Sequence, residues 1–182
     1  MTWLNTVLVL VAAFLAVFWE AAFQLLRHVL GAQVDLLPGL VVHASLATNF
    51  QTLCLLTVCG GLWYDSLSAN PLGISVLPLS LVGVALYSQR DVIVKDQPFA
   101  HFVLGAIAST AAPALSLMLL LTTGHTPLLG WGTLWQFVVM GVGGAVATPL
   151  IFILFEWLQR ALVHSRAVET TFRPDREIRR GR

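Results

Sequence analysis

The chain has 182 residues, of which 57% are apolar and only 10% carry a formal charge. Soluble domains are nearer 25% charged, so this composition argues against a soluble enzyme, a disordered chain and a nucleic-acid-binding module. The net charge of +1 conceals an uneven distribution, because seven of the ten basic residues lie from Arg160 onward. These numbers predict an all-α integral membrane protein with one transmembrane domain.

Long uncharged stretches define the predicted helices, because a helix needs about 20 apolar residues to cross the hydrocarbon core. Asp, Glu, Lys and Arg are absent before Glu20 and from 36–64, 66–89 and 97–155. The stretch 36–64 is too long for one untilted helix, and a polar cluster at 48–52 interrupts it, so we divide it there. The six predicted transmembrane helices cover 3–27, 36–48, 52–65, 72–88, 98–122 and 133–164. Without the division, five spans remain.

Basic residues predict the orientation, because they collect on the cytoplasmic side of a membrane. We expect a transmembrane domain over 1–164 and a basic, disordered cytoplasmic tail over 165–182. Such a tail suits anionic lipid or a cytoplasmic partner. Its basic residues are Arg166, Arg173, Arg176, Arg179, Arg180 and Arg182. Aromatic residues near predicted helix ends are interpreted as interfacial anchors: Trp3, Trp63, Tyr64, Trp131, Trp135 and Trp157.

Ionisable residues within the predicted spans are few, and each one is a candidate functional group. Glu20 and His43 are candidate polar contacts inside the membrane. A polar contact between helices is the favoured interpretation of His43, with Ser45, Thr48 or Asn49 as partners, and a proton or ligand site is the alternative. We find no metal-binding, phosphate-binding or nucleophile motif, so the sequence predicts no enzyme activity and no cofactor.

Two further acidic residues have structural interpretations. Asp35 precedes the helix 36–48 and can accept hydrogen bonds from its free backbone N–H groups. Glu156 lies one turn before Arg160, a spacing that predicts an ion pair.

Small residues indicate where helices pack closely. Gly105 and Ser109 lie on one face of the helix 98–122, and Gly141, Gly144 and Ala145 lie in the helix 133–164. Small residues at this spacing let two backbones approach each other. Pro78, Pro113 and Pro149 fall inside predicted helices, where each is expected to produce a kink.

A polar turn separates the helices 52–65 and 72–88. Gly60 and Gly61 allow close packing, Asp65 ends the first helix, and a polar turn follows before the apolar residues resume at Leu72. Asp65 and Ser68 are expected to accept or donate hydrogen bonds at the two free helix ends.

This hairpin resembles that of the bacterial rod shape-determining MreD family. The family has a glycine-rich helix, an aspartate, leucine-serine, proline-leucine-glycine and an apolar helix. The matching residues here are Gly61, Asp65, Leu67, Ser68, Pro71, Leu72 and Gly73. Asp35-Leu36-Leu37 also resembles a family segment, although Val34 replaces its proline, and Ala69-Asn70 stands where glycine is common.

The resemblance implies a multi-pass component of the bacterial inner membrane with a cytoplasmic carboxy terminus. It implies a six-helix fold similar to the substrate-binding subunits of energy-coupling-factor transporters. The implied role is a non-enzymatic scaffold for lateral peptidoglycan elongation. Its implied partners are an MreC-like protein, MreB filaments, the elongation transpeptidase and a RodA-like glycosyltransferase. The alternative is a vitamin-binding subunit of an energy-coupling-factor transporter, which requires a polar pocket of vitamin size.

Overall fold

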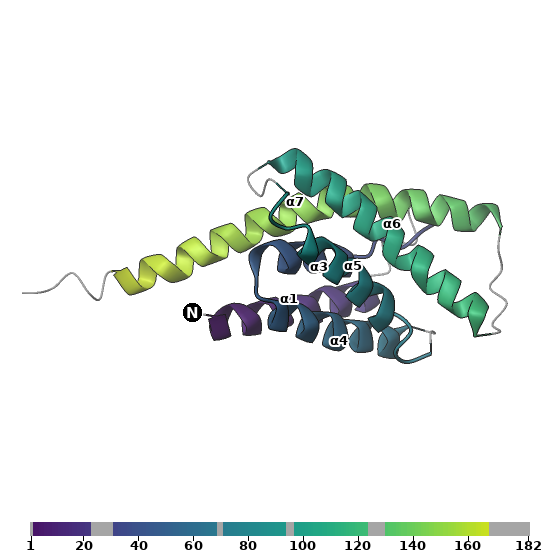
Figure 1. Cartoon of the computed structure of the whole chain (residues 1–182), viewed down its shortest axis with the longest axis horizontal. Helices are drawn as coiled ribbons and strands as arrows, with labels where there is room; N and C mark the ends of the chain where they lie inside the picture. Colours follow the sequence, from purple (N-terminus) through teal and green to yellow (C-terminus); the bar gives the residue numbers. More distant parts are fainter. Residues whose placement is uncertain (1, 23–30, 69–70, 94–96, 124–129, 168–182) are drawn as a thin grey trace, which may run out of the picture. The chain divides into compact units, whose positions relative to one another are not determined.

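A computed structural model describes residues 2–22, 31–68, 71–93, 97–123 and 130–167, and these residues form six α-helices (Figure 1). The helices are α1 (Thr2–Ala22), α3 (Leu37–Ala47), α4 (Phe50–Leu67), α5 (Val76–Ser88), α6 (Pro98–Thr122) and α7 (Trp131–Ala167). The described residues contain no strand, which confirms the predicted all-helical class. Residues 23–27 of the first predicted helix lie outside the described part.

Among the described residues, three helices are long and apolar enough to cross a membrane, namely α1, α6 and α7. The apolar helices α3 and α5 have 11 and 13 residues. At 1.5 Å per residue they are roughly 17 and 20 Å long, shorter than the ~30 Å hydrocarbon core. The helical segments therefore agree with the sequence prediction, whereas the six-span topology stays a prediction.

The chain divides into two compact units, Met1–Ile151 and Phe152–Arg182. In the first unit, α3 is the central helix, and every residue from Leu37 to Leu46 is buried. The helix contacts α1, α4, α5 and α6, and Gly39 also faces Thr148 of α7. Because α3 is apolar on all sides, complete burial among other helices is its stable arrangement.

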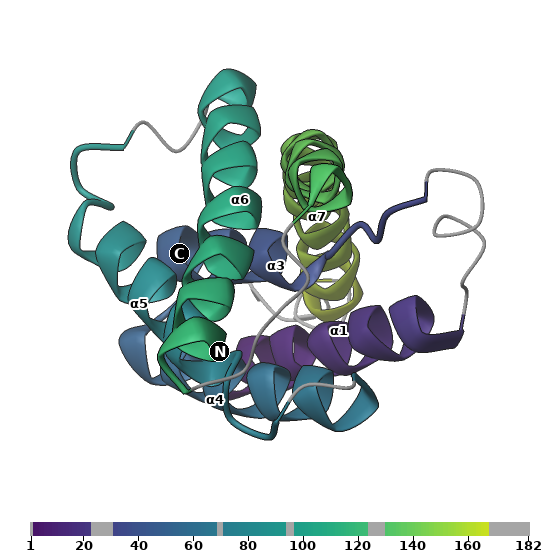
Figure 2. The same ribbon diagram turned by 90° about the vertical axis from the view of Figure 1, so that its right-hand side faces the viewer.

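The helix α1 lies alongside α4 (Figures 1 and 2). Val9, Ala13 and Val17 form a buried stripe at i, i+4 spacing, while the large apolar side chains on its other faces are exposed. The Thr6 and Thr52 hydroxyls share a hydrogen bond of 2.8 Å across this contact. A helix with a small buried stripe and an apolar outer face suits a lipid environment.

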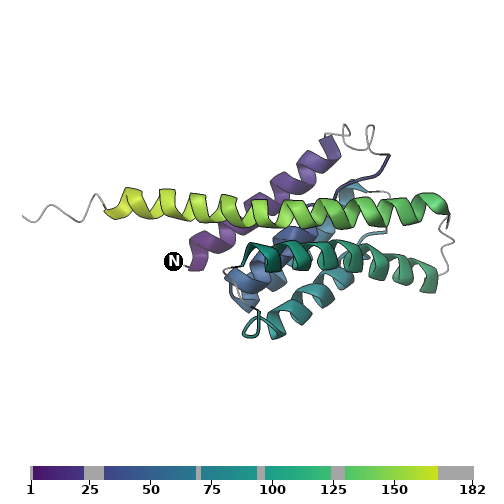
Figure 3. The ribbon, with the colours of Figure 1, turned by 90° about the horizontal axis from the view of Figure 1, so that it is seen from above.

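Close packing joins the antiparallel helices α6 and α7 (Figure 3). A Cβ atom added at Gly144 would meet the side chain of Ser109 and, at 2.9 Å, the carbonyl oxygen of Gly105. One added at Gly141 would lie 2.8 Å from Thr110. The small residues predicted to pack therefore lie at a helix–helix contact, and Ala145 beside them is buried.

Several predicted helix starts differ from the structure, and α7, like α4, begins two residues earlier than predicted. The helix after the polar turn begins at Val76 rather than Leu72, because residues 72–75 form a turn. Pro78 consequently falls in the first turn of α5, where the missing N–H has no intrahelical partner to lose, so the predicted kink does not apply there. The helix α4 begins at Phe50, two residues earlier than predicted.

The second unit includes the end of α7. Arg160 donates a hydrogen bond of 3.0 Å to the Glu156 carboxylate, which confirms the predicted ion pair. The helix continues to Ala167, so it includes the first residues of the predicted tail, 165–167. The tail arginines from Arg173 onward lie outside the described residues.

Candidate functional site

Carboxylates cap the buried start of α3. The helix has no side-chain cap from its own N-cap residue, Leu36. Instead, Asp35 Oδ1 accepts a hydrogen bond of 3.0 Å from the Leu37 N–H. The Glu20 carboxylate of α1 accepts a hydrogen bond from the Leu36 N–H. These bonds satisfy N–H groups that would otherwise be unpaired in an apolar environment. The capping expected of Asp35 is therefore observed.

A third carboxyl group holds the turn before α5. Asp65 is 1% exposed, and its Oδ2 accepts hydrogen bonds of 2.8 Å from the Gly73 N–H and 3.1 Å from the Ser75 N–H. The Ser68 hydroxyl donates to the Asp65 carbonyl oxygen at 3.3 Å. Both residues therefore make the hydrogen bonds at helix ends that the sequence predicts.

The remaining hairpin residues give the turn its shape. A Cβ atom added at Gly61 would lie 2.9 Å from the backbone Cα of Val76, so glycine lets α4 and α5 approach each other. Gly73 has a φ angle of +92°, in the left-handed region that favours glycine. The Pro71 carbonyl oxygen accepts a hydrogen bond of 3.3 Å from the Ile74 N–H. The Leu72 side chain is exposed.

The positive φ angle at Gly73 leads to a stability prediction. Gly73→Ala is expected to lower the free energy of unfolding by about 1 kcal/mol, because an L-residue is strained in the left-handed region. An added Cβ would meet no atom within 4 Å, so the loss is conformational rather than steric. Melting temperatures in detergent would measure it. Gly130→Ala is the matched control, since Gly130 is equally open and lacks a positive φ. Equal melting temperatures for the two variants would contradict the prediction.

The three carboxyl groups converge near Tyr64 of α4. The Tyr64 side chain interacts electrostatically with Asp35, Glu20 and Asp65, and Glu20 also interacts with Asp35. Glu20 Oε2 and Asp65 Oδ1 are buried and accept no hydrogen bond from the described residues. The described residues contain no group of three His, Cys, Asp or Glu side chains that could hold a metal ion.

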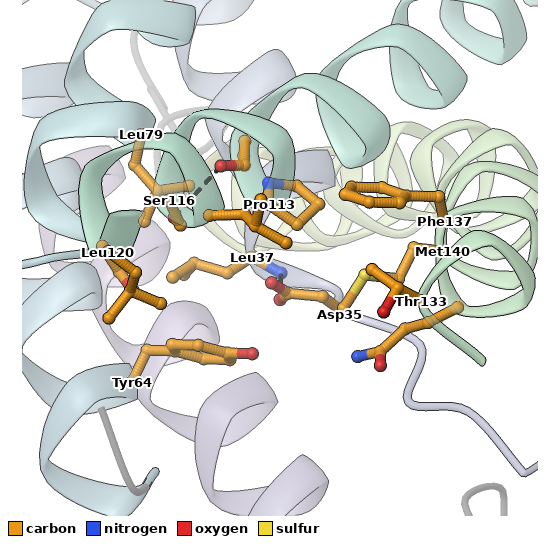
Figure 4. A pocket seen from close by; sticks show the side chains of 14 residues that line it. Asp35, Leu37, Tyr64, Leu79, Pro113, Ser116, Leu120, Thr133, Phe137 and Met140 are labelled. Atoms are coloured by element: carbon orange, nitrogen blue, oxygen red, sulfur yellow. Dashed lines mark hydrogen bonds between the residues drawn. The ribbon is translucent and has the colours of Figure 1, made fainter. Parts of the chain in front are cut away.

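A cavity of about 200 Å³ adjoins this acid cluster (Figure 4). Asp35 and Tyr64 contribute polar groups to one side, and α6 and α7 contribute most of the remaining wall. The full lining comprises Asp35, Leu37, Tyr64, Ser75, Leu79, Ala112, Pro113, Ser116, Leu117, Leu120, Thr133, Gln136, Phe137 and Met140. Burial raises the pKa of the Asp35 carboxyl from 3.8 to about 6, and the Leu37 N–H opposes this shift.

The predicted functional residues separate into different places. Glu20 and Asp65 belong to the acid cluster, whereas His43 is buried in α3 and interacts electrostatically with His101 of α6. The predicted polar contact of His43 with Ser45, Thr48 or Asn49 stays a prediction. Ser45 and Thr48 instead donate hydrogen bonds to the backbone carbonyls of Val42 and Ala44.

Sequence reasoning missed the cavity and the role of Tyr64. It interpreted Tyr64 as an interfacial anchor, but the side chain points into the bundle beside Asp35 (Figure 4). One signal was available, because Tyr64 lies three residues after Gly61 and four after Gly60, on the tightly packed face of the helix.

The chain matches no protein-family model, and it has no significant match among curated proteins or solved structures. Function must therefore be inferred from the residues and their geometry.

Proposed function

We propose that this protein is a non-enzymatic, MreD-like scaffold of the bacterial inner membrane. In this proposal the chain crosses the membrane six times and keeps its carboxy terminus in the cytoplasm. It assembles an MreC-like protein with the enzymes of lateral peptidoglycan synthesis, including an elongation transpeptidase and a RodA-like glycosyltransferase. MreB filaments associate with the same assembly, and the basic tail contacts anionic lipid.

The hairpin around Asp65 is the observation that carries the proposal. Its motif residues have separate physical tasks: Gly61 permits close helix packing, Asp65 caps the turn, and Gly73 adopts the positive φ. A shared motif whose residues act together in one turn supports a resemblance in structure more strongly than a shared hydropathy pattern does.

The cavity is the observation that favours the alternative, a vitamin-binding transporter subunit. A buried carboxyl group and a tyrosine hydroxyl beside a cavity are features of small-molecule sites. The volume of about 200 Å³ argues against this function, because such sites typically enclose about 300–1,000 Å³. The scaffold function is therefore the better supported of the two.

Purification of the tagged protein from its native host in mild detergent tests the proposal. We expect mass spectrometry to identify an MreC-like single-pass protein together with wall-synthesis enzymes. Asp65→Ala and Gly73→Leu should reduce the recovery of these partners, because both changes disturb the hairpin. Recovery of paired ATPases and a membrane coupling subunit would instead support the transporter function. Unchanged partner recovery and cell shape in both variants would count against the scaffold function.

A further inference from the structure

Asp35 is an acidic residue whose hydrogen bonds leave part of its carboxyl group available. The residue is 9% exposed, and it lines the cavity (Figure 4). Its Oδ1 accepts the Leu37 N–H, and none of the described residues donates a hydrogen bond to its Oδ2. A buried carboxylate is costly unless a positive charge or further hydrogen bonds compensate it. The cavity therefore presents a negatively charged wall in an apolar environment.

The two arginines whose side chains the structure describes, Arg90 and Arg160, both have other partners. Arg90 lies 3.8 Å from Asp91 and its guanidinium stacks over the Tyr87 ring at 4.2 Å. Arg160 pairs with Glu156. Around Asp35 the other titratable groups are Glu20 from α1 and Tyr64 and Asp65 from α4, and the α5, α6 and α7 residues that line the cavity include none. None of these neighbours is a cation, so none of them compensates the charge of Asp35.

The size and lining of the cavity indicate what kind of group it accepts. Its volume of about 200 Å³ is small for a complete ligand. Leu79, Leu120 and Phe137 form apolar walls, whereas the carboxyl group of Asp35 and the side chain of Gln136 are polar. An arginine or lysine side chain combines an apolar stem with a charged end and matches both parts of this lining.

We infer that the cavity receives an arginine or lysine side chain from the membrane segment of a partner protein, with Asp35 as its counter-ion. This inference rests on the proposed scaffold function, because it identifies where the scaffold holds a partner. Since the pair forms away from water, losing either charge leaves the other buried and uncompensated. The contact would select partners that carry a basic residue at the matching depth.

The inference has a consequence for pH dependence. A cation beside Asp35 favours the ionised carboxylate, so protonation competes with partner binding. Because burial raises the pKa of free Asp35 to about 6, affinity should fall as the pH drops below that value. Asp35→Asn should remove most of this dependence, because asparagine does not titrate.

Site-specific photo-cross-linking tests the inference in cells. A photoreactive amino acid replaces Gln136, which lines the cavity, and mass spectrometry identifies the cross-linked peptide. We expect a membrane-protein segment with Lys or Arg within one helical turn of the cross-link. A cross-link only to phospholipid, or to a segment without a basic residue, would overturn the inference.

A charge exchange provides the second measurement. Asp35→Asn keeps an oxygen that can accept the Leu37 N–H, and it should weaken partner binding about tenfold or more. Asp91→Asn, at an exposed acid, is the matched control and should leave binding unchanged. Asp35→Lys should abolish binding, and Lys or Arg→Asp at the cross-linked partner position should restore it. Wild-type affinity in Asp35→Asn, or failure of the exchange in variants that retain the wild-type melting temperature, would contradict the inference.

The two proposals can fail separately. If wall-synthesis proteins co-purify equally with wild type and Asp35→Asn, the scaffold function stands and the basic-side-chain contact fails. If the cross-linked basic residue belongs to a protein unrelated to wall synthesis, and the charge exchange succeeds, the contact stands and the scaffold function fails.

Discussion

Asp65→Ala is expected to destabilise the folded protein by about 3 kcal/mol. The change removes the acceptor for the Gly73 and Ser75 N–H groups, and each buried unpaired donor costs roughly 1–3 kcal/mol. Ser75, which immediately precedes α5, is buried, so water does not readily replace the lost acceptor. For a chain of this size the melting temperature should fall by roughly 10 °C, which thermal unfolding in detergent would measure.

Asp65→Asn separates the hydrogen bonds from the acidity of the group. The asparagine oxygen can still accept from Gly73 and Ser75, so a much smaller loss than in Asp65→Ala is expected. An equal loss in both variants would mean that the two N–H bonds are not the main contribution of Asp65. Asp91→Ala, on the loop between α5 and α6, controls for the removal of an exposed acid.

The local parts of the fold were predictable because their causes are local. The break between α3 and α4 follows from Thr48, whose N–H and hydroxyl both donate to the Ala44 carbonyl while its backbone is extended. Ser, Thr and Asn side chains compete with helical hydrogen bonds in this way, so a cluster of them indicates an interruption. Capping by Asp35 was also predictable, because the interaction is local: the Asp35 carboxylate accepts from the N–H of Leu37, two residues further along the chain.

The contacts that build the candidate site were not predictable, because they join distant parts of the chain. Glu20, which belongs to α1, accepts a hydrogen bond from the Leu36 N–H, 16 residues further along the chain. The cavity is lined by side chains of α6 and α7 as well as by Asp35. Periodicity identifies the buried face of a helix but not the helix that packs against it. The start of α5 was misplaced for a related reason, because Asp65 holds residues 73–75 in a turn that apolarity alone does not indicate.

The short helices and the acid cluster have a common physical explanation. Both α3 and α5 begin inside the apolar body, where their free N–H groups need acceptors. Neither helix has a capping side chain at its own N-cap position. Asp35 and Glu20 accept N–H groups at the start of α3, and Asp65 accepts two in the turn that leads into α5, so three carboxyl groups gather in one region. The negative wall of the cavity is thus a consequence of how the bundle terminates two buried helices.

Gly105→Ala is expected to separate α6 from α7 and to destabilise the bundle by about 2 kcal/mol. A Cβ atom at this position would lie 2.7 Å from Thr148 Cβ and 2.5 Å from the Gly144 carbonyl oxygen, which belongs to the backbone. Backbone atoms cannot rotate away, so the helices must shift, and overpacking of this kind typically costs about 1–3 kcal/mol. The expected result is a lower melting temperature in detergent.

Gly132→Ala is the matched control for this change. Gly132 also lies in a helix, near the start of α7, but an added Cβ there would meet no atom within 4 Å. Alanine is the better helix former by about 1 kcal/mol, so this variant should be neutral or slightly more stable. Opposite shifts of the two melting temperatures would show that close approach, rather than helix propensity, requires glycine at position 105. A gain in stability at both positions would mean that α6 and α7 do not pack through Gly105.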